Sequence, residues 1–279
     1  MTPRTPGSGV LYIVSTPIGN LGDITYRALE TLRSVTLVLA EDTRHSRKLL
    51  AHFEIGTPLE SYHEHNEARA TPGLVRRLLA GESMALITDA GTPLLSDPGS
   101  RLVAAAIEAG VDVSPIPGAS ALLAALVAAG IAADRFTFFG FLERKGRDRA
   151  AEIESLRTLG HTAVVYESPN RVAATLRDLA AAGLSERRAA VGRELTKQFE
   201  ELRRGTVEEL ARYYEDASVR GEVVIVIEGG EMRQASEDEL RARADELRAG
   251  GASARDVAAA LAAELGAPRN LAYRIAHER

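Results

Sequence analysis

Eight short apolar runs constrain the fold of this chain more than any other feature of its sequence. Each holds five to seven residues, and helix-like segments separate them. The runs cover residues 10–14, 35–40, 84–88, 111–116, 136–141, 162–167, 189–195 and 222–228. Strands that alternate with helices favour an α/β fold, and continuously apolar strands are typical of parallel sheets buried on both faces. The sequence therefore predicts an α/β protein with largely parallel strands.

The segments between the runs carry recognisable helix start and stop signals. Thr25 precedes one helix-like stretch, while Asp97 and Ser168, each followed by a proline, precede two others. Gly110 and Gly183 stand where the latter two should stop. Side chains that cap a helix start, proline in the first turn and glycine after the last turn are the expected punctuation of helices.

Two domains and a tail follow from the order of these signals. The glycine-bearing charged stretch 142–149 is typical of a linker, so we place a boundary after residue 141. A further extended segment is expected over 198–205 and a helix over 207–215. The predicted units are an N-terminal α/β domain (1–141), a second α/β domain (142–232) and a C-terminal helical extension (233–279).

Composition excludes several kinds of chemistry. The chain has 279 residues and no cysteine, which rules out disulfides, thiolate zinc sites and cysteine nucleophiles. Among six histidines only His63 and His65 lie close together, and their spacing suits no common zinc motif, so no metal is expected. No apolar stretch is long enough for a membrane span, and we expect a cytoplasmic protein that does not contact a membrane.

The net charge of −5 argues against a protein whose whole surface grips nucleic acid. Local basic patches remain candidates for such contacts, and each is equally typical of the solvated face of a helix. The basic runs lie at 44–48, 76–77, 144–149 and 203–204.

Distinctive loops follow the predicted strands, at the end of the sheet where open α/β folds hold ligands. They read STPIGN (15–20), AEDTRHS (40–46), TDAGTPLLSDPG (88–99), IPGAS (116–120), YESPNR (166–171) and RELTK (193–197). Neither a P-loop nor a dinucleotide fingerprint is present, which disfavours ATP hydrolysis and ordinary dinucleotide chemistry.

The loop TDAGTPLLSDPG is the most informative. Gly91 allows a tight turn, Asp97 is expected to cap the following helix, and Asp89 stays free for a ligand. A stiff loop of this kind presents bare backbone N–H and C=O groups, which suits an adenosine-bearing ligand with few charges. Tandem turns with a helix cap remain the alternative. Gly118 and Ser120 offer a similar surface after the fourth run, with an ordinary helix start as the alternative.

Charged groups beside these loops are candidates for proton transfer and for binding a polar substrate. Asp42 and Arg44 follow the second run, and Arg44 suits a phosphate. A helix cap at Asp42 is an equally good interpretation. Glu194 and Lys197 form either a binding edge or a plain ion pair.

Taken in order, these motifs resemble the tetrapyrrole (corrin/porphyrin) methylase superfamily and, more closely, the ribosomal RNA small subunit methyltransferase I family. The similar pieces include LYIVSTPIGNLGDIT, AEDTRHS, YHEHNE, ITDAGTPLLSDPG, PIPGAS, FFGFLERK, YESPNR, RELTK and GEVVIVIEG, which run from about residue 10 to 230. The resemblance implies two α/β domains with S-adenosyl-L-methionine in the cleft between them. It also implies 2′-O-methylation of a cytidine in 16S rRNA, in the decoding region of the small ribosomal subunit, and a homodimer.

The resemblance also implies roles for individual residues. In the wider superfamily a Gly-Asp-Pro loop contacts the methyl donor, and Gly91, Thr92 and Pro93 match it with Thr92 in place of the acid. The implied cofactor-binding residues are Pro17, Asp89, Ala90, Gly91, Thr92, Pro93, Leu95, Gly118, Ser120, Ala121, Tyr166 and Leu195. The catalytic candidates are Asp42, Arg44, Glu194 and Lys197, and the RNA-binding candidates are Arg144, Lys145, Arg147 and Arg149.

Two other functions are consistent with parts of the sequence. A tetrapyrrole methylase would use the same cofactor on a porphyrinoid, although Thr92 departs from the loop of those enzymes. A non-enzymatic nucleic-acid binder could use the helical tail, but that tail is rich in alanine and only modestly basic.

Overall fold

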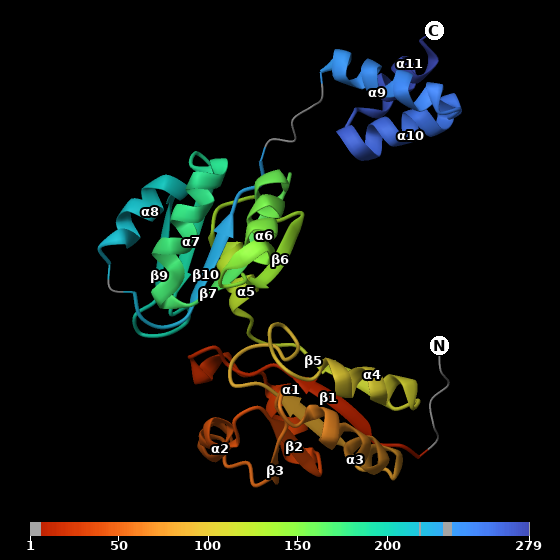
Figure 1. Ribbon diagram of the computed structural model, residues 1–279. Coiled ribbons are helices and arrows are strands. Elements are labelled where there is room, and N and C mark those ends of the chain that lie inside the picture. The colour runs from red at the N-terminus through yellow and green to blue at the C-terminus, as the bar shows by residue number, and fades with distance from the viewer. Residues whose placement is uncertain (1–6, 218, 231–235, 279) are drawn as a thin grey trace.

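Two α/β domains and a helical extension make up the computed structural model, which describes residues 7–217, 219–230 and 236–278 (Figure 1). The mixed α/β class and the helical extension are as predicted. Within the described residues no helix is both long enough and apolar enough to cross a membrane. No group of three or more potential metal-ligating side chains occurs there either.

The first sheet has five parallel strands in the order β3-β2-β4-β1-β5. Its strands are β1 (Val10–Val14), β2 (Leu37–Ala40), β3 (Leu59–Ser61), β4 (Met84–Ile87) and β5 (Asp112–Ile116). Every residue of β2 and β4 is buried, because helices cover both faces of the sheet. The covering helices are α1 (Tyr26–Ser34), α2 (Thr43–His52), α3 (Glu67–Leu79) and α4 (Ser100–Glu108), and the short η1 (Leu21–Asp23) follows β1 with no buried residue. The predicted parallel pairing is confirmed in this domain.

Two elements of the first domain escaped sequence analysis. Strand β3 has three residues, of which only Leu59 is apolar, so it lacks the signal of a buried strand. Helix α3 contains Pro72 followed by Gly73, a pair that ordinarily indicates a turn. The helix forms nonetheless because Leu74 and Leu78 are buried in the core of the domain.

The second sheet is mixed, with the order β6-β7-β10-β8-β9. Its strands are β6 (Phe136–Phe141), β7 (Thr162–Glu167), β8 (Arg188–Arg193), β9 (Glu201–Thr206) and β10 (Val223–Ile227). Only β6 and β7 pair in parallel, and the other three pairs are antiparallel. The expectation of largely parallel strands is therefore wrong for this sheet. The connection between β8 and β9, residues 194–200, is too short for a parallel crossover.

The predicted boundary at residue 141 is also wrong. Strand β6 belongs to the second sheet, and helix α5 (Ala121–Ala128) packs against the same sheet through Leu122 and Ala125. The chain changes domain within residues 117–120, between β5 and α5. The charged stretch 142–149 is the turn from β6 into α6 (Gly146–Thr158), and its glycine provides a positive φ at the start of that helix.

The remaining helices match the sequence signals closely. They are η2 (Pro169–Arg171), α7 (Val172–Leu179), η3 (Ala180–Leu184), α8 (Val207–Glu215), α9 (Glu237–Ala249), α10 (Ala254–Leu265) and α11 (Arg269–His277). Gly183 has φ +93° at the end of its helix, as a stop residue should. The last three helices form their own apolar core around Leu240, Val257 and Leu261. This packing confirms a helical extension.

Candidate functional site

Loops of the first domain meet the second domain around a cavity of about 350 Å³, which we call the Tyr166 cavity. The cofactor-binding candidates that line it are Asp89, Ala90, Gly91, Thr92, Leu95, Ala121 and Tyr166. Sequence analysis missed further lining residues from both domains, among them Ile18, Asp97, Phe141 and Glu222. Segments far apart in the chain therefore share one hollow.

A second cavity of about 480 Å³, which we call the Lys197 cavity, adjoins the first. Its lining includes Pro17, Ser46, Lys48 and Lys197. The two cavities have five lining residues in common, which are Ile18, Thr88, Asp89, Ala90 and Glu222. Two chemical groups held in the separate cavities would therefore face each other across this shared wall.

Hydrogen bonds hold the loops of the shared wall together. The N–H of Thr16 donates to the carbonyl of Gly91 at 2.8 Å, and the N–H of Gly91 donates back to Thr16 at 3.1 Å. The hydroxyl of Thr92 lies 2.9 Å from that of Ser15 and donates to the carbonyl of Ala119 at 3.2 Å. Thr92 thus joins three loops.

Backbone strain is concentrated in the loop 88–99, where several residues have a positive φ. Gly91 has φ +85°, and Leu94 and Ser96, which carry side chains, have φ of +73° and +70°. Such values are uncommon for residues other than glycine and are most often found where structure serves function. The glycine is needed because a Cβ there would lie 3.3 Å from the side chain of Ile18 in addition to the unfavourable φ.

Asp97 does not cap helix α4, so that prediction is wrong. The N-cap residue is Gly99, and Asp97 instead lines the Tyr166 cavity. The pKa of Asp97 is raised to about 6, mainly by burial. A hydrogen bond with Thr88 lowers this pKa, whereas the nearby carboxylates of Glu41 and Asp89 raise it further. The side chain therefore changes charge close to neutral pH.

Lys197 is held as a fixed cation at the edge of the second cavity. Its Nζ donates to Glu194 at 2.8 Å and to Glu222 at 3.0 Å. Burial opposes its charge, but these hydrogen bonds outweigh burial and raise the pKa of Lys197. Gly19 makes room for it, since a Cβ at that position would lie 2.3 Å from Cγ of Lys197.

Glu194 is the partner of this cation. Its hydrogen bond from Lys197 lowers the pKa of the carboxyl, which makes it a weak proton acceptor. Its backbone has φ +51°, and its N–H donates to the carbonyl of Glu222 at 3.0 Å. The turn after β8 is thereby fastened to the start of β10, the contact that brings Glu222 to the cavities.

Asp42 caps helix α2, which is the alternative interpretation of the motif that contains Asp42 and Arg44. Asp42 is the N-cap of α2 and accepts from the N–H of Arg44 at 2.8 Å. Its carboxylate also pairs with the guanidinium of Arg44 at 2.8 Å, and these contacts hold the pKa of Asp42 well below its usual range. Neither residue lines the two cavities. Their catalytic roles stay predictions.

Five other cofactor candidates lie outside the Tyr166 cavity. Pro17 lines the Lys197 cavity instead. Pro93, Gly118, Ser120 and Leu195 line neither. Gly118 permits close packing, since a Cβ there would lie 2.9 Å from that of Ser15, and Leu195 belongs to the core under α5. These residues support the loops that form the cavities.

Arg149 is not available to RNA, and its assignment is corrected. The residue is buried, and its guanidinium donates to Asp178, to the carbonyl of Glu143 and to the hydroxyl of Thr175. It joins α6 to α7. The sequence alone does not distinguish the buried Arg149 from its exposed basic neighbours, because the position of a residue in a basic run does not reveal its burial.

Arg149→Ala is expected to lower the free energy of unfolding by about 2–3 kcal/mol, because three partners lose charge-assisted or buried hydrogen bonds. Urea unfolding followed by circular dichroism measures this value. Arg147→Ala, at an exposed neighbour, is the control and should change stability by less than about 0.5 kcal/mol. Equal stabilities of the two variants would contradict a structural role for Arg149.

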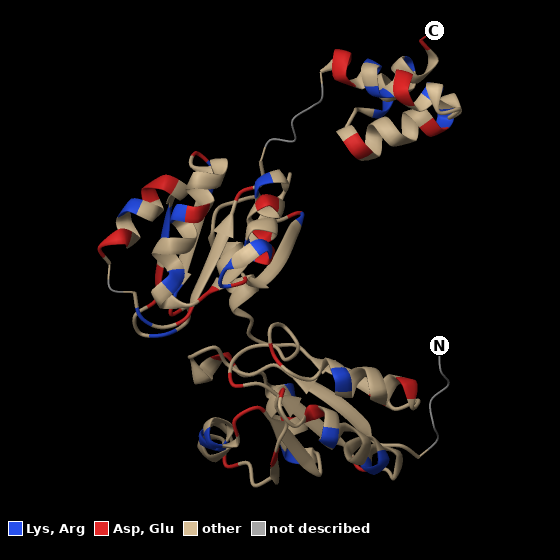
Figure 2. Cartoon of the chain, in the orientation of Figure 1, with Lys and Arg blue, Asp and Glu red and all other residues tan. Residues whose placement is uncertain are grey.

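The other three basic candidates, Arg144, Lys145 and Arg147, are exposed and form no ion pair with any residue that the structure describes. They follow Phe141, which lines the Tyr166 cavity. Figure 2 shows both signs of charge distributed over both domains, so any basic contact surface is local.

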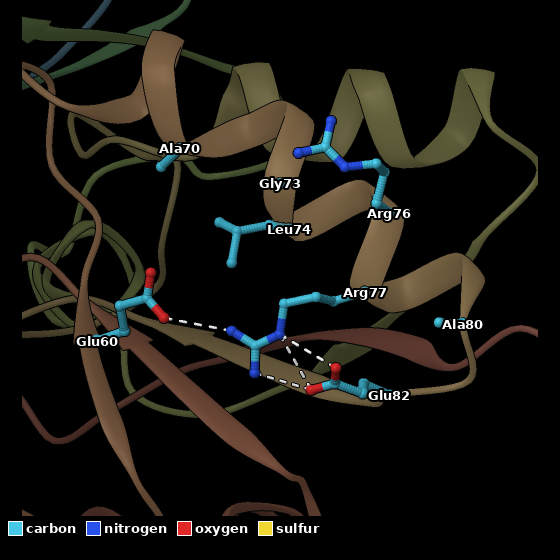
Figure 3. Close-up of a pocket in the computed structure, with 8 residues that line it drawn as sticks. All are labelled: Glu60, Ala70, Gly73, Leu74, Arg76, Arg77, Ala80 and Glu82. Carbon is cyan, nitrogen blue, oxygen red and sulfur yellow. Dashed lines mark hydrogen bonds and ion pairs between the residues drawn. The ribbon is translucent and has the colours of Figure 1, made fainter.

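A third hollow, of about 410 Å³, lies beside α3, and ion pairs run along its lining (Figure 3). Arg77 bridges Glu60 at 3.3 Å and Glu82 at 2.8 Å there. These contacts satisfy the guanidinium and attach α3 to the edge of the first sheet. The hollow shares no residue with the two cavities described above.

Comparison with known proteins adds sequence relatives. Residues 10–211 match the family model described as tetrapyrrole (corrin/porphyrin) methylases. A Synechocystis sp. protein named ribosomal RNA small subunit methyltransferase I is 47% identical over 273 residues, covering 97% of this chain and 98% of that protein. A Pseudomonas aeruginosa protein of the same name is 45% identical over 279 residues, covering 98% of each.

Solved structures are similar in fold at lower identity. Uroporphyrin-III C-methyl transferase from Thermus thermophilus, complexed with S-adenosyl homocysteine, has a TM-score of 0.57 at 21% identity and covers 81% of this chain and 99% of its own. Diphthine synthase has a TM-score of 0.62 at 17% identity and covers 79% of this chain and 90% of its own.

Proposed function

The chain belongs to the tetrapyrrole (corrin/porphyrin) methylase family and, within it, to the ribosomal RNA small subunit methyltransferase I family, and we propose that it methylates the 2′-oxygen of a cytidine ribose in 16S rRNA. The protein is an S-adenosyl-L-methionine-dependent methyltransferase. Its substrate would be the small ribosomal subunit, with the target in the decoding region. The pair of adjoining cavities is the observation that carries the proposal, since a group transfer needs two reactants side by side.

The Tyr166 cavity fits the methyl donor. Leu95, Ala121, Phe141 and Tyr166 give it apolar walls for an adenosine. Its charged lining residues are Asp89, Asp97, Glu167 and Glu222, all of them acidic. Such a lining suits a cationic sulfonium and the hydroxyls of a ribose. When bound, S-adenosyl-L-methionine supplies an electrophilic methyl group.

The residues of the shared wall would act on the ribose hydroxyl. Lys197 offers a fixed positive charge to the ribose oxygen as its proton leaves and negative charge develops on it before it attacks the methyl group. Asp89 and Glu222 both line the two cavities, and because Glu222 is paired with Lys197, we assign Asp89 as the carboxylate that accepts the hydroxyl proton. The N–H of Asp42 donates to Asp89 at 3.3 Å, so Asp42 would contribute by positioning Asp89. Arg44 is almost fully exposed at the start of α2, where a phosphate could reach it.

Donor binding should depend on pH through Asp97. With a pKa of about 6, the carboxylate is charged above pH 6 and attracts the sulfonium, whereas below pH 6 it is neutral and does not. Lowering the pH from 8 to 5 should therefore weaken binding of S-adenosyl-L-methionine by about two- to fivefold relative to S-adenosylhomocysteine, which lacks the sulfonium charge. Calorimetric titration of both ligands gives this ratio.

Asp97→Asn provides the matched control, because the amide keeps the shape and cannot ionise. The ratio of the two affinities should then be independent of pH. A pH-independent ratio in the unaltered protein would contradict a role for Asp97 in attracting the sulfonium.

The exposed cations Arg144, Lys145 and Arg147 should contact RNA phosphates. Changing all three to Glu is expected to weaken binding of small subunits at least about tenfold and to flatten its salt dependence, with donor binding intact. Filter binding at several salt concentrations measures both effects. Arg69→Glu, at an exposed position on α3, is the control. Equal loss of donor and subunit binding would overturn the assignment.

The reaction itself is tested by incubating the protein with labelled methyl donor and unmethylated small subunits, followed by mapping of the modified ribose. Formation of 2′-O-methylcytidine supports the proposal. Transfer to a porphyrinoid instead of RNA would overturn it in favour of a tetrapyrrole methylase. We also propose that the protein acts as a homodimer in the cytoplasm, which light scattering of the purified protein tests for the assembly.

A further inference from the structure

The Lys197 cavity differs from its neighbour in having cationic side chains among the charged groups of its lining. His45, Lys48 and Lys197 line it, together with the two shared acids Asp89 and Glu222. Among the described residues, no lysine, arginine or histidine lines the Tyr166 cavity. The two lysines of the Lys197 cavity balance its two acids, whereas the charged residues that line the Tyr166 cavity are all acidic, so a phosphate is better accommodated in the first cavity and a cation in the second.

Apolar groups in the Lys197 cavity are left uncovered. Leu21 lines it and is 40% exposed, and Pro17, Ile18 and Leu49 form the rest of its apolar surface. Lys48 is exposed on the same wall and has no ion pair with any residue in the described ranges. A ligand with a flat apolar face and a phosphate would cover the leucine and pair with the lysine.

Ser46 provides an independent observation. It is 1% exposed and lines the Lys197 cavity, and its hydroxyl has no hydrogen-bond partner among the described residues. A buried hydroxyl without a partner costs free energy, and in native structures such a group calls for a specific reason. A polar group of a bound ligand would supply the missing partner.

We infer that the Lys197 cavity receives the target nucleotide, turned out of the RNA chain, with Ser46 hydrogen-bonded to it and Lys48 at its phosphate. This inference rests on the proposed function and specifies its acceptor site. A nucleotide that leaves its stack brings both its base and its ribose within reach of a cavity beside the donor. The shared wall then places the ribose next to Lys197 and Asp89.

The test uses Ser46→Ala and Lys48→Glu in the full chain. Ser46→Ala removes an unpartnered hydroxyl, so it should leave thermal stability equal or higher. It should nonetheless weaken equilibrium binding of unmethylated small subunits, and raise their KM, by about three- to tenfold. Lys48→Glu should weaken subunit binding about tenfold at low salt and less at high salt. The Kd of S-adenosyl-L-methionine should stay unchanged in both variants.

Ser155→Ala is the matched control, because Ser155 also lies within a helix and its hydroxyl is bonded to the backbone of its own helix, α6. If subunit binding is unchanged in both cavity variants, the inference is overturned. If donor binding falls with subunit binding, the cavity belongs to the donor, which also overturns it. Subunit binding that responds to the variants without methylation of the subunits would refute the proposed function and retain the nucleotide site.

Discussion

Lys197→Met is expected to slow methyl transfer to small ribosomal subunits by about 100- to 1,000-fold at saturating substrate, the usual loss when one stabiliser of a developing oxyanion is removed. Lys197 is the cation at the edge of the acceptor cavity, and two carboxylates hold it in place. The Kd of S-adenosyl-L-methionine should change by less than about twofold, because Lys197 is absent from the lining of the Tyr166 cavity. Single-turnover kinetics with bound subunits measures the chemical step apart from RNA affinity.

Two further variants separate chemistry from folding. Lys197→Arg keeps the positive charge and should recover part of the rate. Glu194→Gln keeps Lys197 charged and its second partner Glu222, so the loss should stay within about tenfold. If Lys197→Met remains folded and transfers methyl groups at the normal rate, Lys197 has no part in the reaction.

Gly91→Val is expected to weaken binding of S-adenosyl-L-methionine at least about 30-fold. A β-branched residue is strongly disfavoured at φ +85°, and strain of about 2 kcal/mol corresponds to that factor in affinity. The new side chain would also press on Ile18, which lines both cavities. The strained loop can relax only by breaking its paired hydrogen bonds with Thr16. Calorimetric titration of the donor measures the loss.

Gly56→Val is the matched control for this substitution. Gly56 is exposed, and a Cβ there meets nothing within 4 Å, so donor binding should be unchanged. A Gly91→Val protein that melts like the unaltered protein and still binds the donor normally would show that the loop 88–99 does not form the donor site.

The sequence predicts the strands well where burial is complete. Strands β2, β4 and β10 are buried at every position, so their apolar runs are unbroken. The sequence does not predict β3, which is too short to show a pattern, or α3, where Pro72 is a residue typical of turns. The domain boundary was misplaced because strand partners depend on contacts distant in sequence, and β6 pairs with β7 rather than with the first sheet.

The site was predicted in part for similar reasons. Loops at strand ends carry a local signature, which indicates Gly91, whereas Ala121 and Tyr166 follow from the family resemblance. Asp97 was assigned to a helix start because the same Asp-Pro pair fits both roles in sequence. Glu222 precedes a buried strand and reaches the cavities only through the antiparallel pairing of β10 with β8, which no local pattern reveals.

A crystal structure of the protein with S-adenosylhomocysteine is the most direct test of where the methyl donor binds. The cavities described above predict the ligand between the two domains, with its adenosine against Leu95, Ala121 and Tyr166 and its sulfur directed toward the shared wall at Asp89. A ligand seated wholly among Ser46, Lys48 and Lys197, or outside both cavities, would contradict the division of donor and acceptor sites proposed for this protein.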